Sequence, residues 1–310
     1  MSSQPASRAH LPPSPEDQGP AGVRGRADGG RSGSGPAILG SLITEWPVER
    51  GLGAVVERVE PGAVTLGCDL LPGRLDRHGQ PIMAVLSCLA DCAIGVSVFS
   101  AFSTPTGGST VEMRVDRSAP LGPGAAALRV DGVLSHRVAS SGVGRAVLTD
   151  DTGVVVAHAM ATMAVVGAKA SAGGASDPGG GLFEAPSSPA VRFDPVALDG
   201  LSVWDSRDPL TANVPLDETM SNPRRQVHGG VLLAIAERAQ RRVHPDGAST
   251  LSASIEYIRP VPIAVETVEC RSTVVRQGRR FSTVRTDFVR PDGKLAAVAT
   301  SIAMVAPAEA

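Results

Sequence analysis

The chain has 310 residues, a formal net charge of -2, and 42% apolar but only 3% aromatic side chains. This length allows two domains, and their cores must consist mainly of Val, Leu, Ile and Ala. The near-zero charge gives no electrostatic reason to expect a nucleic acid as partner. No window approaches the ~18 apolar residues of a membrane span. The N-terminus also lacks a secretory signal, so we expect a cytoplasmic protein.

The four cysteines form neither a metal-binding motif nor a disulfide framework, so we expect no metal site. Cys88 and Cys92 are four residues apart on a predicted helix and could approach each other. Free thiols buried in a reducing cytosol are the favoured interpretation.

The first predicted domain spans residues 37–166 and follows a tail, residues 1–36, whose Pro, Gly, Ser and Arg content is typical of disorder. The domain opens with a strand pair within 53–70, joined by a turn at Pro61-Gly62. A long helix is predicted near 82–102, apolar nearly all round. Three further strands follow the pair Ser109-Thr110, with turns at residues 122–124, 141–142 and 151–153.

The second predicted domain spans residues 191–310, after a flexible linker over 167–190 that is rich in Gly, Ala and Ser. Its helix is predicted near 229–243, where Val231, Leu232, Ile235 and Ala239 recur at helical spacing. Its later strands are separated by breaks at residues 260–262, 277–278 and 291–293.

The two domains repeat each other. Ser-Thr at Thr110 and the proline at Pro120 recur 140 residues later as Thr250 and Pro260. A unit this long is too large for a solenoid repeat, so the pattern indicates domain duplication. One long helix within a run of strands predicts an α+β fold in which an antiparallel sheet wraps around that helix.

The two helices begin differently. The run Asn222 to Glu237 reads NPRRQVHGGVLLAIAE, whereas its echo from Asp76 to Asp91 reads DRHGQPIMAVLSCLAD and lacks His-Gly-Gly. The asparagine, the His-Gly-Gly turn, the acid seven residues later and the following Ser-Thr strand resemble hotdog-fold acyl-CoA thioesterases. The chain looks most similar to the PaaI-like branch, here as a tandem double hotdog. The resemblance covers about residues 40–166 and 195–306.

The resemblance implies a composite site in which one hotdog domain supplies the turn and its partner supplies the acid and a strand hydroxyl. Carried over to this chain, it joins residues of the second domain to residues of the first, namely Asn222, His228 and Gly229 with Asp91 and Thr110. The reciprocal set, Glu237 and Thr250 with Asp76, Ile82 and Met83, lacks the histidine and both glycines. We expect that second site to be weak or inactive.

The chemistry of the first set fits thioester hydrolysis. Gly229 at a helix N-terminus presents an unpaired N–H and no Cβ, so it can stabilise an oxyanion. Asp91 can activate water or attack the thioester directly, and the sequence does not separate the two. His228 can donate to the carbonyl, Asn222 can orient water or the turn, and Thr110 can bond Asp91 or the water.

Several of these residues also have plain structural interpretations. Asp91 can be a satisfied buried acid, His228 a turn residue, and Thr110 and Thr250 ordinary strand residues. Glu237 precedes Arg241 by four residues and reads most simply as a surface ion pair, so it is a minor candidate with Thr250. Three arginines near a predicted hairpin could bind the phosphates of coenzyme A, or lie in a solvated turn: Arg276, Arg279 and Arg280.

We therefore expect an acyl-CoA thioesterase that uses no cofactor beyond the coenzyme A of its substrate. One alternative is a non-catalytic acyl-CoA-binding or regulatory protein. Another is a hotdog enoyl-thioester hydratase, although its Asp and His signature is not visible. Acyl thioesters are the expected partners, and a homo-oligomer of double-hotdog units is plausible by resemblance. Acyl chain length is not readable.

Overall fold

The computed structural model describes residues 43–102, 105–167, 188, 190–200, 208 and 210–305. The predicted tail, residues 1–36, and nearly all of the predicted linker lie outside these residues. Within them, two halves of similar design follow each other along the chain, and their strands belong to one sheet.

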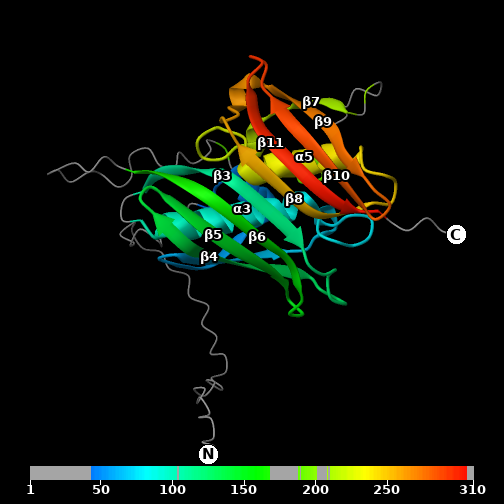
Figure 1. Ribbon diagram of the computed structural model, residues 1–310. Coiled ribbons are helices and arrows are strands. Elements are labelled where there is room, and N and C mark those ends of the chain that lie inside the picture. The colour runs from blue at the N-terminus through cyan, green and yellow to red at the C-terminus, as the bar shows by residue number, and fades with distance from the viewer. Residues whose placement is uncertain are drawn as a thin grey trace, which may run out of the picture. The chain divides into compact units, whose positions relative to one another are not determined.

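The first half contains six strands and one long helix (Figure 1). A short helix, α2 (Pro47–Leu52), precedes the predicted strand pair, and the turn between the two strands has Gly62 at a φ of +84°. The strands and the long helix follow in the predicted order, as β1 (Val55–Glu60), β2 (Ala63–Asp69), α3 (Met83–Ser100), β3 (Pro105–Arg117), β4 (Ala127–Val138), β5 (Ser141–Asp150) and β6 (Val155–Gly167).

One predicted turn is displaced. The break expected at residues 141–142 lies at 139–140 instead, where Ala139 adopts a φ of +47°. Ser141 and Gly142 already pair with β6, because Ala139 and Ser140 form the turn between β4 and β5.

The second half has the same order of elements, with one described strand before its helix. That strand is β7 (Thr211–Pro215), at the edge of the sheet. The remaining elements are α4 (Ala197–Gly200), α5 (Gly229–Arg241), β8 (Ser249–Tyr257), β9 (Thr267–Gln277), β10 (Phe281–Val289) and β11 (Leu295–Met304). Short 3₁₀ turns cover Pro72–Arg74, Glu218–Met220 and Ile263–Val265.

The halves join where β3 pairs with β8 in an antiparallel register that places Val115 opposite Ala253. The resulting eleven-stranded sheet has the order β1-β2-β4-β5-β6-β3-β8-β11-β10-β9-β7. Both long helices pack on this sheet, α3 against the strands of the first half and α5 against those of the second. The helices also pack against each other, and the first turn of α5 lies beside Ser87 and Cys88 of α3 (Figure 1).

Helix α3 is buried from Met83 to Val98. By length and composition it could cross a membrane, contrary to the expectation from the sequence, but 89% of it is buried within the protein. A helix that contacts both a sheet and a second helix has few solvent-exposed positions, which explains its uniform apolarity. The four cysteines are free and buried, as predicted.

Candidate active site

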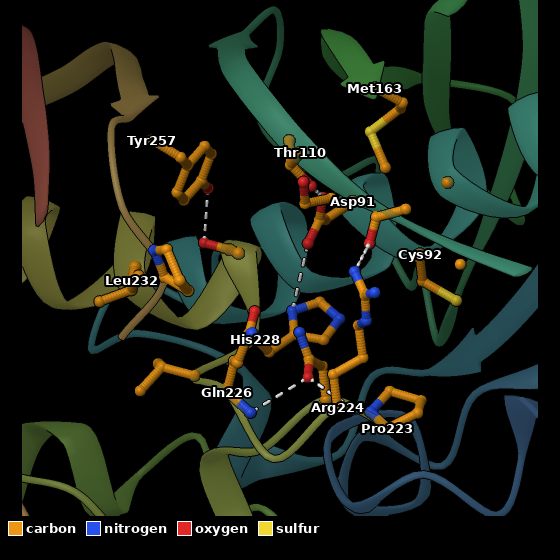
Figure 2. Close-up of a pocket in the computed structure, with 18 of the residues that line it drawn as sticks. Asp91, Cys92, Thr110, Met163, Pro223, Arg224, Gln226, His228, Leu232 and Tyr257 are labelled. Atoms are coloured by element: carbon orange, nitrogen blue, oxygen red, sulfur yellow. Dashed lines mark hydrogen bonds and ion pairs between the residues drawn. The ribbon is translucent and has the colours of Figure 1, made fainter. Parts of the chain in front are cut away.

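A cavity of about 310 Å³ lies where the two halves meet. Its walls come from α3, from β3, from the loop that leads into α5 and from the segment that ends β8 (Figure 2). All five predicted catalytic residues line it: Asp91, Thr110, Asn222, His228 and Gly229. The folded chain therefore brings these residues of the two halves together around one cavity.

The carboxylate of Asp91 faces the other half of the protein from α3. Its Oδ1 accepts a hydrogen bond from the hydroxyl of Thr110 at 2.7 Å. Its Oδ2 accepts one from the backbone N–H of Gly230 at 3.1 Å, across the boundary between the halves. Asp91 is only 7% exposed, so these donors and the positive end of α5 stabilise a charge that burial would otherwise penalise.

His228 caps the N-terminus of α5. In the neutral ring its Nδ1 accepts a hydrogen bond from the N–H of Gly230 at 3.1 Å. The same nitrogen lies 3.4 Å from Oδ2 of Asp91. The other ring nitrogen, Nε2, lies 3.1 Å from Oε1 of Glu49 on α2. The imidazole is thus held between two carboxylates, one of which the sequence did not indicate.

The charges around His228 favour its protonated form. Burial alone lowers the pKa of the imidazole, but the facing carboxylates of Glu49 and Asp91 outweigh it, together with hydrogen bonds to Glu49 and Cys88. The pKa of His228 is consequently raised well above its usual value of 6.5. In the protonated ring the Nδ1–H faces Asp91, and the N–H of Gly230 keeps Oδ2 of Asp91 as its acceptor.

The two glycines after His228 have different physical roles. A Cβ on Gly229 would lie 2.6 Å from Oδ2 of Asp91, and within the described residues its N–H has no hydrogen-bond partner. A Cβ on Gly230 would lie 2.5 Å from the Cα of Cys88 on α3. Gly229 therefore leaves space in the cavity beside the acid, whereas Gly230 allows the two helices to approach closely.

Tyr257 completes the site and was not predicted. Its hydroxyl donates to the carbonyl oxygen of Gly229 at 2.7 Å, and so holds the first peptide of α5 in place. Burial, with the nearby Asp91 and Cys88, raises the pKa of Tyr257 well above its usual value, so the hydroxyl remains a donor. A signal existed in the sequence, since this sole tyrosine occupies the position of Arg117 in the 140-residue repeat.

Asn222 organises the loop before α5. Its side-chain oxygen accepts hydrogen bonds from the N–H groups of Arg224 and Gln226, at 2.9 and 3.2 Å. Asp76 does the same in the first half, accepting from His78 and Gln80. The repeat supports the second of the two predicted roles, orientation of the turn. With its oxygen so engaged, the Asn222 amide nitrogen is the polar group left to face the cavity.

The reciprocal pair, Glu237 and Thr250, forms the same hydrogen bond as Asp91 and Thr110, but no His-Gly-Gly turn faces it. Thr250 donates to Oε1 of Glu237 at 2.7 Å, and Glu237 is 4% exposed. Within the described residues Glu237 forms no ion pair with Arg241, so the predicted surface pair is wrong; α5 turns this position inward. Met83 starts α3 where Gly229 starts α5, and Arg117, in the place of Tyr257, donates to the carbonyl of Pro81.

The arginines predicted to bind coenzyme A lie at the other end of the sheet. They occupy the β9–β10 hairpin, whose strands run in register with the Thr250 end of β8 rather than its Tyr257 end. None of Arg276, Arg279 and Arg280 lines the cavity. Arg224 and Arg259 do, and Arg224 donates to the carbonyl oxygen of Gly108 at 3.3 Å. The sequence indicated a basic hairpin, but not its distance from this cavity.

The family comparison agrees with the fold. Residues 216–305 match the family model described as the acyl-CoA thioesterase N-terminal domain. No curated protein sequence matches the chain.

Solved structures share the architecture over most of the chain. A candidate oleoyl thioesterase from Lactobacillus plantarum has a TM-score of 0.55 at 10% identity, covering 80% of this chain and 98% of its own. An acyl-ACP thioesterase from Bacteroides thetaiotaomicron has a TM-score of 0.50 at 11% identity, covering 78% and 97%. A hot dog fold protein from Alicyclobacillus acidocaldarius has a TM-score of 0.50 at 14% identity, covering 78% and 94%. At these identities the likeness establishes the fold.

Proposed function

We propose that this hotdog-fold chain is a thioester hydrolase and that it hydrolyses an acyl-CoA at the composite site between its halves. The match of residues 216–305 to the acyl-CoA thioesterase model supports this proposal. The observation that carries this proposal is the placement of the Asp91 carboxylate against the bare Cα of Gly229. An acid from one half and an oxyanion donor from the other then share one cavity.

Gly229 is the proposed oxyanion donor. Its N–H is unpaired among the described residues and stands at the first turn of α5, and Gly229 lines the cavity. The helix dipole adds positive potential at that point. A thioester carbonyl can approach because no Cβ intervenes, and Tyr257 fixes the next peptide group through the carbonyl oxygen of Gly229. Such a preorganised donor is typically worth about 10²–10³ in rate.

Asp91 is the proposed general base. Thr110 and Gly230 hold its two oxygens, so the carboxylate is fixed in orientation and still has lone pairs for a water molecule. Direct attack by Asp91 would form a covalent bond at an oxygen that Thr110 or Gly230 holds in place. Activation of water requires only a proton to move, and we therefore favour it over a covalent intermediate. General-base catalysis typically contributes about 10²–10⁴-fold.

The reaction then proceeds in two steps. Asp91 takes a proton from water as the oxygen attacks the carbonyl carbon, and the carbonyl π electrons move onto oxygen, which Gly229 stabilises. The tetrahedral intermediate re-forms the carbonyl as the C–S bond breaks. The thiolate of coenzyme A leaves and accepts the proton from Asp91, giving a free acid and a free thiol. Only protein groups and water take part.

The test is acyl-CoA hydrolysis followed by release of free thiol, with a panel of acyl chains. Asp91→Asn should lower kcat by at least about 10²-fold, because the amide cannot accept the proton. Glu237→Gln is the matched control, since Glu237 has the same buried Thr partner in the reciprocal pair. It should retain activity.

The opposite pattern would contradict the proposal. If Glu237→Gln abolished hydrolysis while Asp91→Asn retained it, the site assignment would be wrong. Tight acyl-CoA binding without thiol release by the wild type would instead support the regulatory alternative.

A further inference from the structure

Glu49 is a buried acid in the wall of the cavity with no assigned role. It belongs to the short helix α2, which precedes the first strand, and is 1% exposed. Its Oε2 has no hydrogen-bond partner in the described part of the chain. A buried carboxylate is costly unless it is paired, so its position beside the site requires an explanation.

The partner of Glu49 is His228. Oε1 of Glu49 lies 3.1 Å from Nε2 of His228, on the side of the ring opposite Asp91. Both side chains are almost fully buried, with 1% and 7% of their surface exposed, so little solvent screens the pair. The thiols of Cys88 and Cys92 on α3 also belong to the cluster, Cys88 beside His228 and Cys92 beside Glu49.

Glu49 offsets an unfavourable position for a cation. His228 caps α5 at its N-terminus, where the helix dipole is positive and disfavours a protonated ring. The carboxylate of Asp91 lies 3.4 Å from Nδ1 of this ring, and it already accepts hydrogen bonds from Thr110 and Gly230. A second carboxylate, at hydrogen-bonding distance from Nε2, supplies the additional negative charge that keeps the proton on the ring.

We propose that Glu49 is a positioning residue that holds His228 as an imidazolium next to the oxyanion turn. The positive ring then adds to the potential of α5 at the Gly229 N–H, where negative charge develops on the thioester oxygen. This inference rests on the proposed function for its effect on rate. The state of the His228 ring can be measured without catalysis.

The first test is the pH profile of hydrolysis for the full chain with Glu49→Gln. The amide can accept from Nε2–H but carries no charge, so His228 should lose its proton at lower pH. We expect kcat to fall by on the order of tenfold at neutral pH, with little change in KM. The alkaline limb of the profile should move to lower pH. Glu45→Gln removes an exposed carboxylate four residues earlier and should leave the profile unchanged.

The second test follows the ring nitrogens of ¹⁵N-labelled protein by NMR, with His228→Gln to assign the signal. In the wild type the signal should remain that of an imidazolium well above pH 6.5, and in Glu49→Gln it should titrate at lower pH. An unchanged titration in Glu49→Gln would overturn the proposal. If the wild type releases no thiol, the proposed function fails, and this titration still decides the role of Glu49.

A folding defect is controlled by a conservative variant. Glu49→Asp keeps the charge but shortens the side chain by one methylene. If the two variants are equally stable to heat, the alkaline limb of the Glu49→Asp profile should lie closer in pH to that of the wild type than the alkaline limb of Glu49→Gln does. Equal shifts of the profile in both variants would indicate a packing role and would also overturn the proposal.

Discussion

The hydroxyl of Thr110 donates to Asp91 across 2.7 Å, and the same distance separates Thr250 from Glu237 in the other half. The duplicated chain has thus kept two equivalent acid–threonine pairs. Only the first faces an N-terminal turn with two glycines and a histidine. This pairing provides matched controls for most tests of the site.

Thr110→Val and Thr250→Val should separate catalysis from stability. Each variant leaves a buried carboxylate without one donor, which typically costs about 1–3 kcal/mol in the free energy of unfolding. Only Thr110→Val should also lower kcat, by about tenfold or more, because Asp91 loses its fixed orientation. Chemical denaturation and thiol release measure the two effects. Equal loss of kcat in both variants would contradict a single working site.

Gly229→Ala should mainly lower activity, whereas Gly230→Ala should mainly lower stability. The new methyl on Gly229 would meet the carboxylate of Asp91, so activity should fall by about 10²-fold or more with a modest change in stability. The methyl on Gly230 would meet the backbone of Cys88, which cannot yield easily, so the helices must move apart. We expect a loss of roughly 1–3 kcal/mol in unfolding free energy. A stable Gly230→Ala protein would show that the helix contact is looser than described.

His228 should make the stability of the protein depend on pH above neutrality. Its pKa is raised in the folded state, so its stabilising contribution is complete below the unfolded pKa near 6.5 and is lost as pH rises through the folded pKa. The wild type should therefore lose more stability than His228→Gln between neutral and alkaline pH in denaturant titrations. Parallel curves for the two proteins would contradict the raised pKa.

His244 should change the free energy of unfolding with pH in the opposite direction, in the same experiment. Burial lowers its pKa, so its contribution is present above the unfolded pKa and is lost as pH falls through the folded value. The two histidines thus act on different limbs of the stability profile, and His244→Gln should alter only the acid limb.

The apolar end of the cavity should limit the length of the acyl chain. Gly95 on α3 lines it with Phe99 and Met163, and a Cβ on Gly95 would lie 3.2 Å from the terminal methyl of Met163. Because that methionine end is flexible, Gly95→Ala should fold and narrow the cavity. We expect kcat/KM to fall more for long than for short acyl-CoAs, the short substrates being the internal control. A uniform fall would place the acyl chain elsewhere.

The resemblance to hotdog-fold thioesterases implied the composite site, whereas the sequence by itself indicated the duplication and the α+β fold with one central helix in each half. These followed from local information: the alternation of strands and turns, the apolar period of the helices, and the two unequal copies of one motif. The comparison of the copies moved the proposed base from Glu237 to Asp91, and the contacts of Asp91 with Thr110 and Gly230 agree with that choice.

Only the tertiary structure brought Glu49 and Tyr257 into the site and placed the arginines. No spacing in the sequence indicated the contact of Glu49 with His228, because that contact depends on how α2 packs beside α3. The register of the strands moved Arg276, Arg279 and Arg280 to the far end of the sheet. Repeats and periods record local structure, whereas the charges around a buried histidine depend on long-range packing that neither pattern encodes.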